Sequence, residues 1–414
     1  MHVPGFEPRE VSTLLNRGVI EEHADDAIVL WRMHQHAVGA PLYKLRDLAL
    51  LDERILAHLE GVQTAGTQGL TIAKRSLASE DPGAVFVVAY LGFSARDTEI
   101  MRQIAHVAAA REPFIEAFVS ALTWIEWKDI EDPVQFLARS ERPEFRCAAV
   151  ATAAAHRVRA EDLFVAAAHD SSADVRARAL KAIGETKCHS LVSVLQAAMD
   201  GAEVSCRFWA AWSMALFGDE RAAAVAYETG AADITLSRSA IEIAMRAGEV
   251  GWARSVVRSL ARNGATLREA IIAAAAVGDP ASIPWLLSFL AHPEFARLAA
   301  EAIATIAGVD LEAAAFKQDA PADAPEPHPD DADLRWPAPQ GLSTWWEREQ
   351  HHFVAGQRLL AGAPVGESAA IDVLRSGYQR QRGAAALELA RLRSDTMLFP
   401  VAERADRQQR RLGQ

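Results

Sequence analysis

The stretch Asp174-Val175-Arg176-Ala177-Arg178-Ala179-Leu180-Lys181-Ala182-Ile183-Gly184 holds the clearest evidence for how this chain folds. Its larger apolar side chains recur at i, i+4, i+5 and i+8 and therefore share one helix face: Val175, Ala179, Leu180 and Ile183. An acidic residue stands at the start, where a carboxylate satisfies free N–H groups and suits the helix dipole. We therefore expect a helix that buries one face and leaves its arginines solvated or paired along an edge.

The same pattern of an acid, an apolar residue and a helix returns along the chain. It begins at Glu144, Asp174, Glu203, Asp233 and Glu294, and the 150 residues from the first to the last are five periods of 30. A second helix is expected after each first one, at 161–168, 190–199, 219–228, 250–261 and 281–290. One helix pair cannot bury its apolar face alone, so stacked pairs must bury it jointly in a solenoid.

Residues 174–184 and 294–308 resemble the first helix of a HEAT-type repeat. This resemblance and the period predict an all-α fold, a HEAT-like α-solenoid of stacked antiparallel helix pairs. Alanine, leucine, glutamate and arginine dominate outside these stretches as well, and apolar residues recur at helical spacing. The run Ala84–Tyr90 has the composition of a buried strand, but its helical surroundings favour a buried helix.

Four segments are expected from composition. We predict an N-terminal helical cap over 1–75, HEAT-like repeats over 76–316, an acidic Pro-rich loop over 317–340 and C-terminal HEAT-like helices over 341–414. The cap holds amphipathic helices at about 18–37 and 46–60, and the degenerate repeats hold helices at 82–92, 96–110, 113–121 and 132–139. The last segment is expected to hold helices at 342–361, 367–376 and 378–393.

The acidic loop interrupts the helical pattern. It contains six prolines and no lysine or arginine between Gln318 and Asp333, and its acids are Asp319, Asp323, Glu326, Asp330, Asp331 and Asp333. Such a segment is expected to be mobile, either as a solvated linker or as an electrostatic plug for a basic cleft. The aromatic residues Trp336, Trp345, Trp346 and Phe353 flank it and either pack its ends or form an interface hot spot.

Charge and composition narrow the function. The formal charge of −12 argues against a nucleic-acid binder and favours a basic partner. Cys147, Cys188 and Cys206 fit no disulfide framework or metal spacing, so no metal or cofactor is expected. No secretory signal or membrane-spanning stretch stands out, which predicts a cytoplasmic protein. The sequence contains no phosphate-binding loop, His-Glu-x-x-His or Gly-x-Ser-x-Gly motif, so an enzyme is not expected.

Both ends of the chain resemble a bacterial group of HEAT-repeat proteins often encoded near type VI secretion genes. The similar stretches are Val19–Ala24, Leu30–Arg32, Leu48–Gly61, Trp345-Trp346, Gly356–Leu360 and Gly377–Ala390. The resemblance implies a protein-binding role in the secretion system, and some members look like immunity proteins that neutralise a co-encoded toxin, with nucleases among the candidates. The family offers no catalytic motif to carry over.

These observations predict an immunity protein that occludes the active cleft of a toxin, with a basic nuclease as its partner. The residues expected to bind are the six acids of the loop together with Trp336, Trp345 and Trp346. One alternative is a HEAT-repeat scaffold or adaptor that loads effectors without inhibiting them. Another is an enzyme resembling repeat-type bilin lyases or the DNA glycosylases built from such repeats, although the sequence offers no site for either.

Overall fold

The computed structural model describes residues 16–322 and 324–414, and the regular secondary structure of these residues is helical apart from one short hairpin. The chain forms two compact units. Unit 1 comprises the described residues up to Met33 and Leu51–Leu122, and unit 2 comprises His34–Leu50 and Thr123–Gln414. The described residues contain no helix with both the length and the apolar character that crossing a bilayer requires.

Unit 1 is built around one buried helix, α4. Its elements are most of α1 (Arg17–Gly39), α2 (Leu45–Thr64) and α6 (Glu112–Trp124), with α3 (Gly66–Ala73), η1 (Lys74–Ser79), α4 (Pro82–Ser94) and α5 (Thr98–Ala108). The Asp81 carboxylate caps α4 by accepting from the Gly83 N–H at 2.8 Å. Trp31 stacks on Phe86 with ring centroids 5.2 Å apart. The run 84–90 is therefore the buried helix that its surroundings predicted.

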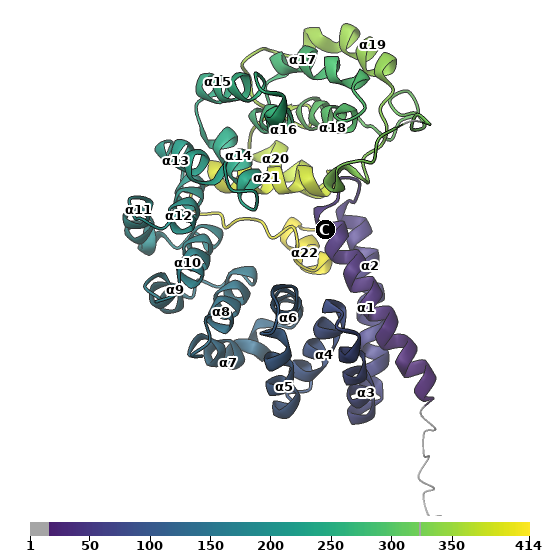
Figure 1. Cartoon of the computed structure of the whole chain (residues 1–414), viewed down its shortest axis with the longest axis vertical. Helices are drawn as coiled ribbons and strands as arrows, with labels where there is room; N and C mark the ends of the chain where they lie inside the picture. The colour runs from purple at the N-terminus through teal and green to yellow at the C-terminus, as the bar shows by residue number, and fades with distance from the viewer. Residues whose placement is uncertain (1–15, 323) are drawn as a thin grey trace, which may run out of the picture. The chain divides into compact units, whose positions relative to one another are not determined.

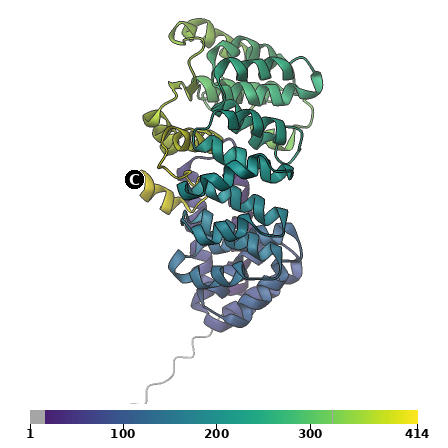
Figure 2. The same ribbon diagram turned by 90° about the vertical axis from the view of Figure 1, so that its left-hand side faces the viewer.

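Unit 2 contains two layers of stacked helices. The first layer consists of α8 (Pro143–Ala155), α10 (Ala173–Thr186), α12 (Val204–Leu216), α14 (Ser237–Ala247), α16 (Leu267–Val277) and α18 (Ala296–Ala307). The second consists of α7 (Trp127–Ala138), α9 (Glu161–Ala168), α11 (Val192–Met199), α13 (Arg221–Gly230), α15 (Val250–Leu260) and α17 (Ile283–Leu287). Successive first-layer helices contact one another, and Figure 2 shows them stacked one above the next. The predicted all-α solenoid is confirmed.

The core of unit 2 lies between the two layers. The predicted face of α10 is buried, with Val175, Ala179, Leu180 and Ile183 each at most 2% exposed. Neighbouring first-layer helices approach closely where small residues meet. At Gly184 an added Cβ would lie 2.8 Å from the backbone of Ser213 on α12, so only glycine fits there.

The C-terminal region folds back onto the array. The helix expected over 342–361 is wrong: α19 (Pro339–Glu349) ends early and is followed by η7 (Gln350–His352) and a hairpin of β1 (Leu359–Leu360) and β2 (Ala363–Pro364). The reason lies in long-range hydrogen bonds, because the hairpin N–H groups of Leu359, Ala361 and Gly362 donate to Gly278, Thr305 and Ile306 at the ends of α16 and α18.

The last helices follow the hairpin. The expected helices over 367–376 and 378–393 are α20 (Glu367–Ser376) and α21 (Gln379–Leu392), and α22 (Ala405–Leu412) lies beyond the predictions. Figure 1 shows α21 and α22 on the side of the first layer opposite α9, α11 and α13, and α21 contacts α12 and α14. This pair therefore covers the first layer instead of extending the stack.

The contact at Gly184 gives a test of the close packing between α10 and α12. We expect Gly184→Ala to destabilise the protein by about 1–3 kcal/mol, because the backbone of Ser213 must shift to admit the methyl group. The control is Gly383→Ala on α21, where an added Cβ meets nothing within 4 Å and the better helix propensity stabilises by up to about 1 kcal/mol. Urea unfolding of both variants measures the difference, and equal stabilities would contradict the close approach.

Candidate functional site

The acidic insertion, residues 317–340, is closed at its base. Lys317 and Pro337 form an isolated antiparallel bridge, and the Gln318 N–H donates to the Trp336 carbonyl at 3.0 Å. The Ala338 N–H donates to the Phe316 carbonyl at 2.9 Å. The two ends of the insertion therefore lie side by side at the end of the repeats.

Asp331 anchors the insertion to the first layer. Its side chain is 3% exposed and forms a two-point ion pair with Arg268 of α16, in which the Nη2–Oδ1 distance is 2.9 Å. Arg297 of α18 donates to the Asp331 carbonyl at 3.4 Å, and its guanidinium lies over the Trp336 ring. An insertion predicted to be mobile is thus held to the repeats, because a buried carboxylate needs its arginine partner.

Arg268 belongs to a periodic series that the sequence interpretation missed. An arginine occurs every 29 to 31 residues, in the first turn of each first-layer helix from α8 to α18: Arg146, Arg176, Arg207, Arg238, Arg268 and Arg297. We call these residues the arginine series. The signal was present in the sequence, since Arg146 and Arg176 directly follow the acidic and apolar positions of the repeat.

Arginines in the first half of the series donate to backbone carbonyls in the turns between helices. Arg146 donates to the carbonyls of Ser140 and Glu141 at 2.9 and 2.8 Å, and Arg176 donates to those of Asp170 and Ser171 at 2.8 and 3.0 Å. Arg146 also pairs with both Asp170 oxygens, at 2.6 and 2.7 Å, which links one repeat to the next. The arginines of this edge are therefore paired, as one of the two sequence alternatives predicted.

The second half of the arginine series lies beneath the acidic insertion. Asp330 is 3.7 Å from both Arg238 and Arg268, and its side chain is half-exposed. Close by, Arg380 of α21 pairs with Glu301 at 2.8 Å and also donates to the Asp330 carbonyl. Burial raises the pKa of Glu301, although Arg380 opposes this shift. Asp331 and Glu301 are thus paired with arginines within the chain, whereas the carboxylate of Asp330 remains half-exposed.

The predicted binding residues fall into two groups. Asp331, Trp336 and Trp346 are buried at 2%, 8% and 9% exposure, and Trp346 stacks on Phe353 with centroids 5.5 Å apart. They serve the anchoring of the insertion and the core of the last repeats. The others retain an accessible surface: Asp319, Glu326 and Asp330 are exposed, and Asp333 and Trp345 are partly exposed. Asp323 lies outside the described residues.

A cavity of about 750 Å³ lies beside the exposed part of the insertion. It is lined by Phe295, Arg268 and Arg297 from the repeats and by Glu326 and His328 from the insertion, among others. Its lining therefore mixes apolar, basic and acidic groups. Such a lining suits contact with side chains of another protein better than capture of one small anion.

Catalysis in the described part of the chain could use a reactive cysteine or a metal site. Its cysteines are free thiols, and burial raises the pKa of Cys147 to about 11, so the thiolate that would act as a nucleophile is disfavoured at neutral pH. Among residues 16–322 and 324–414, no group of three or more His, Cys, Asp and Glu side chains is arranged to hold a metal ion.

Comparison with known proteins supports the repeats. A family described as HEAT repeats matches residues 130–215 and, in a shifted register, 160–246. These residues carry HEAT repeats, which span α7 to α14 in the structure. No curated protein and no solved structure matches the chain. HEAT-repeat solenoids are typically non-enzymatic scaffolds that bind other proteins on extended surfaces.

The Arg146–Asp170 ion pair predicts that the stability of the protein depends on pH. Hydrogen bonds from Arg146 lower the pKa of Asp170 below its ordinary value of 3.8, so folding favours the charged form. This contribution is complete above pH 3.8 and is lost as the pH falls through the lowered folded value. Asp170→Asn should therefore cost about 2 kcal/mol at pH 7 and less at the acid end. Urea unfolding between pH 7 and pH 3 measures this, and a constant penalty would contradict it.

The Arg268–Asp331 pair predicts how firmly the insertion is held. Asp331→Asn removes the buried charge, and we expect local opening to become easier by about 2 kcal/mol, or roughly 30-fold. Trypsin cleavage after Arg335, inside the insertion, reports this opening under native conditions. Asp319→Asn is the matched control, since its side chain is exposed. Equal cleavage rates in the two variants would show that Asp331 is no anchor.

Proposed function

We propose that this chain is a protein-binding scaffold whose acidic insertion presents carboxylates to a basic partner protein. The observation that carries the proposal is the anchoring of the insertion by Asp331, which leaves Asp319, Glu326 and Asp330 exposed beside it. An anchored segment loses less conformational entropy on binding than a free loop does. The formal charge of −12 would steer a basic partner towards this surface.

The finer form of the proposal is an immunity protein of a type VI secretion system. In this form the partner is a co-encoded toxin with a basic active cleft, such as a nuclease, and the exposed carboxylates enter that cleft in place of phosphate. The resemblance of both chain ends to proteins encoded near secretion genes supports this form. The exposure of Asp319, Glu326 and Asp330 supports these acids as the ones that such a toxin would meet first, with Asp333, which pairs with His36, beside them.

The alternative is an adaptor that loads effectors without inhibiting them. The HEAT repeats favour it equally, since stacked helix pairs serve scaffolds and inhibitors alike. Expression of the captured partner in cells distinguishes the two, because an immunity protein restores growth and an adaptor does not.

Charge-neutralising variants test the acidic surface. A tagged chain is used to capture partners from its host at low salt, and the purified partner is then bound to variants. We expect Asp319→Asn, Glu326→Gln and Asp330→Asn together to slow association by about tenfold at low salt, since steering depends on net charge. The control combines Glu131→Gln, Asp132→Asn and Glu161→Gln, which neutralise the same number of exposed acids on α7 and α9. Equal association rates for both triples would contradict the proposal.

A further inference from the structure

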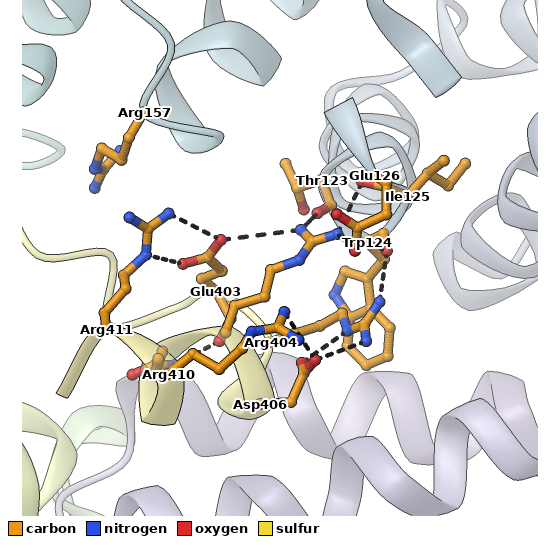
Figure 3. A network of polar contacts seen from close by, with 12 residues as sticks. Thr123, Trp124, Ile125, Glu126, Arg157, Glu403, Arg404, Asp406, Arg410 and Arg411 are labelled. Atoms are coloured by element: carbon orange, nitrogen blue, oxygen red, sulfur yellow. Dashed lines mark hydrogen bonds and ion pairs between the residues drawn. The ribbon is translucent and has the colours of Figure 1, made fainter. Parts of the chain in front are cut away.

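The C-terminal carbonyl groups of α6 form an unusual acceptor site within unit 2. Thr123 and Trp124 end the helix, Ile125 follows it, and Glu126 lies beside them (Figure 3). The last carbonyls of a helix have no partner within it, so they require outside donors. The three backbone carbonyls and the Glu126 carboxylate accept hydrogen bonds from arginines of α22 and its N-cap.

One arginine from the end of the chain fills this site. Arg407 of α22 is 7% exposed and donates to the carbonyls of Thr123 at 2.6 Å, Trp124 at 3.3 Å and Ile125 at 3.0 Å. It also donates to the Glu126 carboxylate at 2.8 Å and lowers the pKa of that group. A guanidinium presents five donors in a planar fork, whereas an ammonium has three on one atom. The site is therefore selective for arginine.

The segment that carries Arg407 contacts the repeats through hydrogen bonds, and its Leu398 side chain also packs against their core. We call Arg393–Leu412 the terminal segment. In its extended part, the Leu398 N–H donates to the Glu185 carbonyl at 3.0 Å and the Leu398 carbonyl accepts from Arg157 at 2.6 Å. His189 donates to the Ser394 carbonyl at 2.9 Å. Binding an extended segment through its backbone is typical of peptide recognition.

Little apolar surface secures the helical end of the terminal segment. The apolar residues of α22 that are buried are Ala405 and Leu412, while Arg410 and Arg411 are largely exposed. Arg404 supports Arg407 by donating to the Trp124 carbonyl at 3.0 Å. Elements with few buried apolar contacts open at low free-energy cost. The terminal segment also carries five arginines and three acids, a positive balance in a chain of charge −12.

These contacts identify the chemistry that the surface accepts. We propose that Thr123–Glu126, with the adjoining ends of α8 and α10, is a docking surface for an arginine-bearing helical segment of a partner protein. The terminal segment occupies it in cis, so a basic partner binds by displacing Arg407 from the α6 carbonyls. This deepens the proposed function, on which it rests for the nature of the partner. It places a second contact surface for that partner on the first layer.

A full-length chain with one backbone cut tests the docking surface directly. A specific protease sequence is inserted between Ser394 and Asp395, which are both exposed, and the protein is cut only after it has folded. A labelled synthetic peptide of residues 395–414 is the probe, and fluorescence anisotropy follows its exchange into the cut protein. Melting curves before and after the cut show that the repeats stay folded. We expect exchange into the cut chain and at least about tenfold weaker binding to the uncut chain, whose tethered segment competes.

Peptide variants test the selectivity for arginine. We expect the peptide with Arg407→Lys to bind at least about tenfold more weakly, because an ammonium cannot reach three carbonyls and a carboxylate together. The peptide with Arg410→Lys is the matched control and should bind like the parent, since the Arg410 side chain is 66% exposed. Equal binding of the two variants, or no exchange at all, would overturn the docking surface.

The captured partner provides an independent arm. Full-length Arg407→Met should bind a basic partner several-fold more tightly than the parent, because its own segment competes less, while Arg410→Met should not change the affinity. An affinity that is equal or weaker with Arg407→Met would contradict the displacement. If peptide exchange is selective for arginine but no basic partner is captured, the docking surface stands and the proposed function fails. If a basic partner is captured but peptide exchange is not selective for arginine, the proposed function stands and the docking surface fails.

Discussion

The carbonyl groups at the ends of helices are the constraint on which unit 2 depends. A stack of antiparallel pairs places the last turns of its first-layer helices along one edge, and each last turn holds carbonyls that need donors. Glycine-rich turns and water satisfy many such groups in proteins. Here Lys187 donates to the Leu216 carbonyl at the end of α12, and burial lowers the pKa of that lysine to about 8. A charged side chain thus satisfies a backbone carbonyl at the end of this helix.

The C-terminal part of the chain supplies most of the other donors on this edge. Arg358 donates to the carbonyls of Met245 and Gly248 beyond α14, at 2.7 and 2.5 Å. N–H groups of the hairpin donate to carbonyls at the ends of α16 and α18, the Leu398 N–H donates to a carbonyl at the end of α10, and Arg407 donates to carbonyls at the end of α6. Each of these contacts satisfies the last carbonyls of a different helix. The C-terminal region therefore links helices that lie far apart along the stack. By folding back, the C-terminal region therefore supplies hydrogen-bond donors that the helix ends of the array need.

The sequence predicted the local part of this structure and little of the rest. A period of 30 residues located the helices from α8 to α15 together with α17 and α18, because each helix buries a face set by its own spacing, whereas α16 was not predicted. The hairpin, α22 and the anchoring of the insertion depend on partners far away in sequence. Asp331 pairs with an arginine 63 positions earlier, and Arg407 reaches carbonyls more than 280 positions earlier. No periodicity encodes such pairs, although the arginine series could have been found by its spacing.

The arrangement of arginines also changes what the net charge means. In the described structure the arginine series and several C-terminal arginines point into turns, helix ends and buried carboxylates, where a fork of donors satisfies several acceptors at once. Buried Asp331 and Glu388 are matched by such arginines, whereas Asp319 and Glu326 face solvent. Each buried ion pair removes one charge of each sign from the surface, whereas Arg176 and Arg358 donate to backbone carbonyls. Asp319 and Glu326 therefore keep their negative charge accessible to a basic partner, because the arginines nearest the insertion are engaged by Asp331 and Glu301.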